Sequence, residues 1–162
     1  MSIVLARIDN RLIHGQVLES WVPYVNANCI VVANDQAAGN GFQKLLMEAA
    51  VPRGIRVVID TVERVADLLS SMELTDRKVL LLLANSQDAL AIHRRGVGCG
   101  KLNLGNMHGG QGKQRVACTI ALDPADVDNL RILEADGVRI VSQCIPSDRE
   151  KDWKKLVQSL GA

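Results

Sequence analysis

Residues 7–17, RIDNRLIHGQV, bring together an acid, a base and a cation at close spacing: Asp9, Arg11, His14 and Gln16. A neutral imidazole has a nitrogen lone pair that can attack phosphorus near pH 7, and a guanidinium offers forked donors to phosphate oxygens. Asp9 could orient the imidazole or hold Arg11, and Gln16 adds a hydrogen-bonding group. These parts suit transient phosphorylation of His14. On spacing alone, a histidine that caps a helix beside a solvated arginine is the simpler interpretation.

Gly15 follows His14 at the predicted start of a helix. The first amides of a helix have no carbonyl partner and lie at the positive end of its dipole, so they favour a bound anion. A group carried on His14 would lie near those donors. Phosphoryl transfer needs positioning and charge stabilisation more than covalent chemistry from the protein, and this arrangement could supply both.

Apolar runs alternate with amphipathic segments along the chain and predict the elements that position these residues. The run SIVLARI, residues 2–8, is almost entirely apolar, as expected for a strand buried on both faces. Further strands are predicted at 29–35, 54–60, 78–84 and 137–143, and two short strands are expected to flank the glycine-rich loop within 101–122.

Helices are predicted between these strands. A short helix from Gly15 to Trp21 should stop near Pro23, and another helix is expected at 87–95. Asp123 and Pro124 suit the start of a later helix, and SDRE, residues 147–150, has capping-box form before a closing helix. Two segments repeat apolar residues at i, i+3, i+4 and i+7, which predicts one apolar helix face each: Phe42, Leu45, Leu46 and Ala49, then Val62, Val65, Ala66 and Leu69.

This alternation predicts the α/β class, with residues 1–162 as a single domain built on an open, mostly parallel sheet with helices on both faces. The strand-to-helix loops then share one rim, where open sheets of this kind bind ligands. Loops 9–15, 34–40 and 105–112 are expected to meet there. They add further candidates to the site: Asn10, Asp35, Asn106, Met107 and His108.

Composition excludes several classes of function. A net charge of +1 and an aromatic content of 2% argue against a nucleic-acid-binding protein. The run VLLLLA, residues 79–84, is too short to span a bilayer. No HxxxH or CxxC spacing supports a metal site, and GGQG lacks the strand and helix context of a nucleotide-binding loop. We therefore expect no metal and no cofactor.

The segment RIDNRLIHGQV resembles the active-site segment of the IIB components of the mannose class of the bacterial phosphotransferase system, which serves mannose, fructose, sorbose and N-acetylgalactosamine-type transporters. The usual family form is close to R-(I/V)-D-(D/E/N)-R-L-I-H-G-Q-V. VVAND at 31–35 and LNLGNMHGGQGKQRV at 102–116 are similar to two further segments of that family. The resemblance extends over nearly the whole chain.

The resemblance implies a phosphocarrier and a family fold with an open, mainly parallel sheet. His14 would accept a phosphoryl group on Nδ1 from a phosphohistidine of the IIA component and pass it to a sugar that enters through the membrane components IIC and IID. Arg11 would steady the group. The protein would be cytoplasmic and held at the inner membrane through its partners. Residues expected to contact the phosphoryl group or a partner are Asp9, Asn10, Gly15, Gln16, Asp35, Asn106, Met107 and His108.

Other interpretations remain. A regulatory protein that reports its phosphorylation state to a partner would use the same His14. Phosphocysteine transfer, as in other IIB classes, is rejected because no cysteine directly follows the first strand. Family members often carry a bulky residue and an arginine where this chain has Gly109 and Gly110, which removes an auxiliary basic contact. The sequence does not identify the sugar, and it leaves a homo-oligomer open because an exposed apolar helix face looks like a core face.

Overall fold

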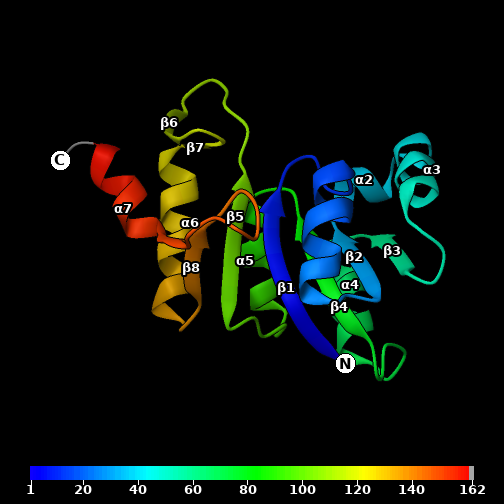
Figure 1. The fold of residues 1–162 in the computed structure, drawn as a ribbon. Helices are drawn as coiled ribbons and strands as arrows, with labels where there is room; N and C mark the ends of the chain where they lie inside the picture. Colours follow the sequence, from blue (N-terminus) through cyan, green and yellow to red (C-terminus); the bar gives the residue numbers. More distant parts are fainter. Residues whose placement is uncertain (161–162) are drawn as a thin grey trace.

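A seven-stranded, mostly parallel sheet runs through residues 1–160, the part of the chain that the computed structural model describes (Figure 1). Residues 161 and 162 of the predicted domain lie outside the described residues. The strand order is β3-β2-β4-β1-β5-β8-β9, and the pairing of β8 with β9 is antiparallel. The strands of this sheet are β1 (Ser2–Asp9), β2 (Cys29–Ala33), β3 (Arg56–Asp60), β4 (Lys78–Leu83), β5 (Lys101–Asn106), β8 (Arg139–Ser142) and β9 (Lys151–Asp152).

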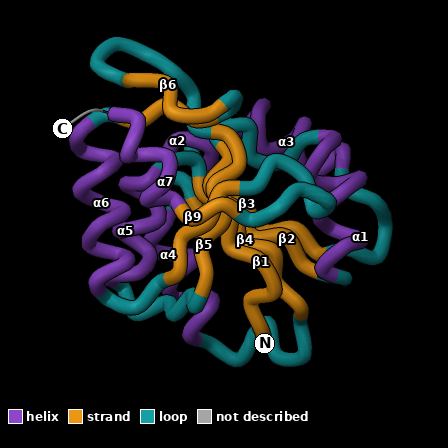
Figure 2. The backbone as a smooth tube through the Cα atoms, turned by 60° about the vertical axis from the view of Figure 1, so that its left-hand side comes forward, coloured by secondary structure: helices purple, strands orange, loops and turns teal. Residues whose placement is uncertain are grey.

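Helices cover both faces of the sheet, with α5 and α6 on one side and α1 and α3 on the other (Figure 2). Because successive strand residues point to opposite faces, β2 gives Val31 to one apolar core and Ile30 and Val32 to the other. The helical elements are η1 (Val17–Trp21), α1 (Val22–Val25), α2 (Asp35–Ala38), α3 (Gly41–Ala50), α4 (Val62–Ser70), α5 (Ser86–Arg94), α6 (Pro124–Ala135), α7 (Trp153–Val157) and η2 (Gln158–Leu160).

The predicted fold class is confirmed: the chain is α/β, and its sheet is mostly parallel with helices on both faces. The strands predicted at 2–8, 29–35, 54–60, 78–84 and 137–143 are found as β1, β2, β3, β4 and β8. β2 ends two residues early because the side chain of Asn34 caps α2, where it accepts a hydrogen bond from the amide of Ala37. Among the described residues, no helix is long and apolar enough to cross a membrane.

The segment 101–122 contains one strand more than predicted. β5 joins the main sheet between β1 and β8, and the glycine-rich loop follows it. β6 (Gln114–Ala117) and β7 (Ile120–Leu122) then form an antiparallel hairpin. The short apolar run of β7 lies next to the main sheet because Met107 forms a bridge with Ile120.

Pro23 does not stop the first helix as predicted. The turn from Val17 to Trp21 is π-helical, and α1 continues through Val25 to Asn26, whose φ of 53° is left-handed. Pro23 lies in the first turn of α1, where a missing amide donor is tolerated.

The closing helix also starts later than its predicted cap. Asp152, rather than Ser147, caps α7, and its side chain accepts from the amide of Lys154. The side-chain amide of Gln143 donates to the carbonyls of Pro146 and Asp148. Ser147, the predicted cap, therefore lies in a turn that Gln143 holds by hydrogen bonds.

The two apolar helix faces differ in burial. Val62, Val65, Ala66 and Leu69 of α4 are buried against the sheet. On α3, Phe42 is 73% exposed, Leu45 63% and Leu46 56%, whereas Met47 enters the core. The helix α3 lies at the end of the sheet where β3 forms the edge, so its opposite side faces solvent (Figure 1).

This contrast predicts different costs for the same substitution. Leu69→Ala should lower the free energy of unfolding by roughly 2 to 5 kcal/mol because it leaves a cavity in the core. Leu45→Ala should change it by less than about 0.5 kcal/mol. Urea denaturation of the two variants measures both values, and an equal loss in the two would show that the α3 face is covered in solution.

Candidate functional site

The carboxylate of Asp9, at the end of β1, is the centre of the predicted site. It is fully buried. Its Oδ1 accepts from Nε of Arg11 at 3.0 Å, and its Oδ2 accepts from Nη2 of the same guanidinium at 2.9 Å. Oδ2 also lies 3.1 Å from Nε2 of His14. The structure therefore brings Asp9, Arg11 and His14 into one hydrogen-bonded group.

The contact with Asp9 determines which ring nitrogen of His14 carries the proton. An ionised carboxylate can only accept hydrogen bonds, so Nε2 of a neutral His14 ring must be the donor. The other nitrogen, Nδ1, then keeps its lone pair, and within residues 1–160 it has no hydrogen-bond partner. The His14 side chain is 17% exposed. The geometry thus leaves Nδ1 as the ring nitrogen with a free lone pair.

The guanidinium of Arg11 is hydrogen-bonded to Asp9 along one edge, and within the described residues it has a free donor, Nη1, on the other. Its side chain is 43% exposed, and Nη2 donates to Oε1 of Gln16 at 3.1 Å in addition to Asp9. The hydrogen bond with Asp9 raises the pKa of Arg11, which keeps the guanidinium charged. No residue of the described part accepts from Nη1. Within this part of the chain, Nη1 therefore keeps its hydrogen-bond donors free.

The chain turns sharply between Arg11 and His14. Leu12 has a φ of 59°, in the left-handed region that is costly for a residue with a Cβ. Its amide donates to the carbonyl of Asp9 at 2.9 Å, and its side chain is buried in the core. The left-handed turn thus places both functional side chains beside the same carboxylate.

Arg7 is a buried cation whose role the sequence analysis missed. Its Nη2 lies 3.6 Å from Oδ2 of Asp9, and its guanidinium lies 4.8 Å from the centroid of the Trp21 ring. Nη1 donates to Oδ1 of Asn103 and, at 2.7 Å, to the carbonyl of Gln143. The sequence did contain an indication of this role. Arg7 is a lone arginine in an apolar strand, and Asp9, two residues later, lies on the same face of that strand. A buried arginine needs such an acidic partner.

Gly105 on β5 makes room for this guanidinium. A Cβ built on Gly105 would overlap the Cζ and Nη2 atoms of Arg7. A side chain at this position would therefore displace Arg7 from Asp9.

The group carries net positive charge. Burial alone would raise the pKa of Asp9, but hydrogen bonds from His14 and Arg11 lower it to about 2. Burial lowers the pKa of Arg7 to about 10, against the opposing attraction of Asp9. Near neutral pH one carboxylate thus lies between two charged guanidiniums, and an anion is favoured beside His14.

Gly15 and Asn10 support the same loop. The amide of Leu18 donates to the carbonyl of His14 at 3.1 Å, so helical bonding starts at Gly15 as predicted. A Cβ at Gly15 would meet nothing within 4 Å. The side-chain amide of Asn106 donates to Oδ1 of Asn10, and the amide of Asn10 donates to the carbonyl of Asn106 at 3.0 Å. This pair ties the loop after β1 to the end of β5.

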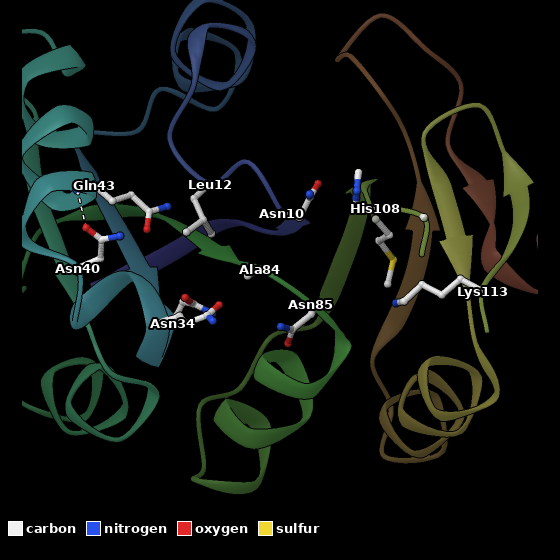
Figure 3. A pocket seen from close by; sticks show the side chains of 12 residues that line it. Asn10, Leu12, Asn34, Asn40, Gln43, Ala84, Asn85, His108 and Lys113 are labelled. Carbon is white, nitrogen blue, oxygen red and sulfur yellow. Dashed lines mark hydrogen bonds between the residues drawn. The ribbon is translucent and has the colours of Figure 1, made fainter. Parts of the chain in front are cut away.

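Within the described residues, no hydrogen bond or ion pair joins Asp35, Met107 or His108 to His14. The carboxylate of Asp35 accepts from the amide of Val62 at 3.0 Å, at the start of α4. Met107 and His108 line a cavity of about 550 Å³, together with Asn10 (Figure 3). The cavity adjoins the Asp9 group, because Asn10 and Leu12 of the same loop line it.

Fold and site together define an α/β protein whose first strand-to-helix loop presents a partly exposed histidine beside paired charges. The chain belongs to the family described as PTS system sorbose subfamily IIB component, which matches residues 3–161. The predicted resemblance to mannose-class IIB components of the phosphotransferase system is therefore confirmed. IIB components of this system transfer phosphoryl groups to sugars.

Individual relatives support the same family. The N-acetylgalactosamine-specific phosphotransferase enzyme IIB component 2 of Escherichia coli strain K12 is 39% identical over 157 residues, 96% of this chain and 99% of that protein. The crystal structure of the IIBSor domain of the sorbose permease from Klebsiella pneumoniae matches with a TM-score of 0.94 and 32% identity, over 99% of each chain. The mannose-specific EIIAB component of Escherichia coli strain K12 is 29% identical over 160 residues, 99% of this chain and 50% of that protein.

The close approach of the Arg7 guanidinium to Gly105 yields one prediction. Gly105→Ala should lower the free energy of unfolding by roughly 1 to 3 kcal/mol, because the added methyl group displaces a buried guanidinium from its partners. Gly110→Ala is the matched control, since a Cβ there would meet nothing within 4 Å. Chemical denaturation measures the free energy of unfolding of both variants. Equal values would show that the Arg7 guanidinium does not need a glycine at position 105.

The low pKa of Asp9 predicts a pH-dependent stability. Its folded value of about 2 lies below the ordinary value of 3.8, so the stabilisation is present above pH 4 and is lost as the pH falls through 2. The gap in unfolding free energy between the wild type and Asp9→Asn should narrow by about 2 kcal/mol over that range. Denaturation curves between pH 5 and pH 2 measure the gap.

Asp128→Asn serves as the control, because Asp128 lies on α6 with an exposed side chain that makes no hydrogen bond or ion pair within the described residues. Its gap from the wild type should stay flat over the same pH range. If the difference in unfolding free energy between the wild type and Asp9→Asn were also independent of pH, Asp9 would not be stabilised by His14 and Arg11 in solution.

Proposed function

We propose that this protein is the phosphocarrier of a mannose-class sugar phosphotransferase system. His14 accepts a phosphoryl group from a phosphohistidine on the IIA component and passes it to a sugar that enters through the membrane components IIC and IID. The observation that carries the proposal is the hydrogen bond between Nε2 of His14 and Asp9, which leaves Nδ1 as the free nucleophile beside Arg11.

In the first transfer, the lone pair of Nδ1 attacks phosphorus and the bond between phosphorus and the donor nitrogen breaks, with its electron pair returning to the donor ring. The His14 ring then carries a phosphoryl group on Nδ1 and a proton on Nε2, so it gains positive charge. The carboxylate of Asp9, 3.1 Å from Nε2, stabilises that charge. In the second transfer, the oxygen of a sugar hydroxyl attacks phosphorus, and the bond between phosphorus and Nδ1 breaks with its electron pair returning to the His14 ring. The hydroxyl proton passes to solvent water, and His14 returns to the neutral ring with its proton on Nε2.

Arg11 supplies the main electrostatic contact to the transferred group. Asp9 fixes the guanidinium through Nε and Nη2, so the Nη1 donors are already oriented before the phosphoryl group arrives. The side chain then needs no reorganisation during the transfer. Arg7 adds positive charge from within the protein, and the first-turn amides near Gly15 add further donors. Such preorganised donors are most effective where charge spreads over the equatorial oxygens of the transferring phosphoryl group.

The partners in this proposal follow from relatives. The mannose-specific relative carries the name EIIAB, and this chain corresponds to half of that protein. We infer that a separate or fused IIA component donates to His14 here as well. The protein then acts in the cytoplasm, at the inner membrane, through contacts with IIC and IID.

The proposal predicts the behaviour of substitutions in the site. After incubation with phosphoenolpyruvate, the general phosphotransferase proteins and IIA, His14→Gln should carry no acid-labile phosphate. Arg11→Ala should be phosphorylated about a hundredfold more slowly, the scale of losing one preorganised transition-state contact. Rapid-quench labelling and mass spectrometry measure both.

His93→Gln is the matched histidine control, because His93 pairs with Asp136 at 2.9 Å, away from the Asp9 group, and should be labelled like the wild type. Phosphate on His14→Gln at the wild-type level would reject the assignment of His14. An unchanged rate for Arg11→Ala would reject the role of Arg11 alone.

A further inference from the structure

A second cavity, of about 340 Å³, lies between the β6–β7 hairpin, α7 and the carboxyl ends of β5 and β8. α7 packs against both β6 and β8, and Figure 1 shows these elements at the end of the molecule away from β3. Each element contributes to the lining: Leu104 of β5, Thr119 of the hairpin, Ser142 of β8 and Leu156 of α7. In the described part of the chain, this hairpin cavity shares no lining residue with the cavity beside the Asp9 group.

The hydroxyl of Ser142 is a buried polar group at the hairpin cavity. Ser142 is only 8% exposed, and it shares a strand face with Ile140, the face against which α6 and α7 pack. Its Oγ makes no hydrogen bond within residues 1–160, although the residue lines the cavity. A buried hydroxyl without a partner is costly, so it favours a ligand that accepts a hydrogen bond.

Two cations without partners line the same cavity. The side chains of Arg149 and Lys151 make no ion pair or hydrogen bond within the described residues. Glu150, which lies between them in the sequence, is already paired with two other cations. Asp148 also lines the cavity, and its carboxylate accepts from the amide of Ile145 at 3.3 Å. Positive charge therefore exceeds negative charge in the lining, which favours an anion.

The rest of the lining is mainly apolar. Two polar side chains there are already committed: Oγ1 of Thr119 donates to the carbonyl of Gly105 at 2.7 Å, and the amide of Gln143 is bound at both its nitrogen and its oxygen. Carbon and sulfur surface comes from Leu104, Ala117, Cys118, Ile120, Cys144 and Leu156. Such a lining suits a ligand with an apolar body, and the volume lies within the range of small-molecule sites, roughly 300 to 1,000 Å³.

We propose that the hairpin cavity binds a small organic anion with an apolar body, whose charged group meets Arg149 and Lys151 and accepts a hydrogen bond from Ser142. The site is separate from the phosphoryl site. Cys144 lies between the two, because its side chain lines the cavity while its carbonyl accepts from Nη2 of Arg7 at 3.1 Å. The proposal goes beyond the phosphocarrier function and does not depend on it.

The test is a titration of the isotopically labelled chain, followed by nuclear magnetic resonance of its backbone amides. Hexanoate and phenyl phosphate are the anionic probes, and saturable shifts of Thr119, Ser142 and Cys144 are expected with at least one of them. The tighter probe identifies the charged group as a carboxylate or a phosphate. Hexanamide, which lacks the charge, and acetate, which lacks the apolar body, should bind roughly tenfold more weakly or worse than hexanoate. No saturable shift with either anion, or equal binding of hexanamide or acetate, overturns the proposal.

Variants locate the binding. Arg149 and Lys151 are exposed, so the double change Arg149→Gln and Lys151→Gln should keep the fold and weaken binding of the tighter anion about tenfold or more. Ser142→Ala should weaken it about tenfold, the scale of one hydrogen bond to a charged group. The double change Lys44→Gln and Arg53→Gln removes the same charge near β3, at the opposite edge of the sheet, and should bind like the wild type. Unchanged affinity in either cavity variant, or an equal loss in the control, overturns the proposal.

Arg11→Ala separates this site from the Asp9 group, which also favours an anion. The variant lacks the exposed guanidinium beside His14 but keeps every residue of the hairpin cavity, so the saturable shift of Ser142 should persist. Loss of that shift in Arg11→Ala would place the anion beside His14 and overturn the proposal.

Discussion

A negative charge buried at the end of β1 sets the arrangement of everything around it. Removing the carboxylate of Asp9 from water is costly unless cations and donors replace the lost hydration. Arg7 does so from within the strand, and Arg11 and His14 do so from the loop. The ring of His14 is oriented because Asp9 needs a donor. His14 and Arg11 are thus placed by the same requirement.

The buried cation extends this dependence into the fold. Arg7 contacts Asn103 on β5, the carbonyls of residues 143 and 144 after β8, and the Trp21 ring. It therefore connects the central strands of the sheet to the helical turn that follows His14. Gly105 is the backbone position that permits this, since any larger residue would occupy the same space. The site is accordingly as rigid as the core beneath it.

The sequence predicted the parts of this structure that follow from local pattern. Apolar runs located the main strands, and the spacing of Asp9, Arg11 and His14 indicated their chemistry. It could not predict features that depend on distant residues. The α3 face containing Phe42 has the same periodicity as the α4 face, and position in the sheet alone decides which is buried. Likewise Arg7 meets Asn103 and Gln143 only after β1, β5 and β8 have assembled. The loops 9–15, 34–40 and 105–112, which were expected to meet at the rim, do line one cavity, whereas the contribution of Ala84 and Asn85 after β4 was not predicted.

The left-handed backbone at Leu12 has a consequence for the speed of the proposed phosphoryl transfer. Because the strained turn is fixed by Asp9 and by core packing, the loop is already in its working shape before a partner arrives, and docking costs little conformational entropy. A carrier that meets a donor and then an acceptor gains from brief encounters without refolding at either surface. Turnover would then be limited by how fast the successive complexes form and separate.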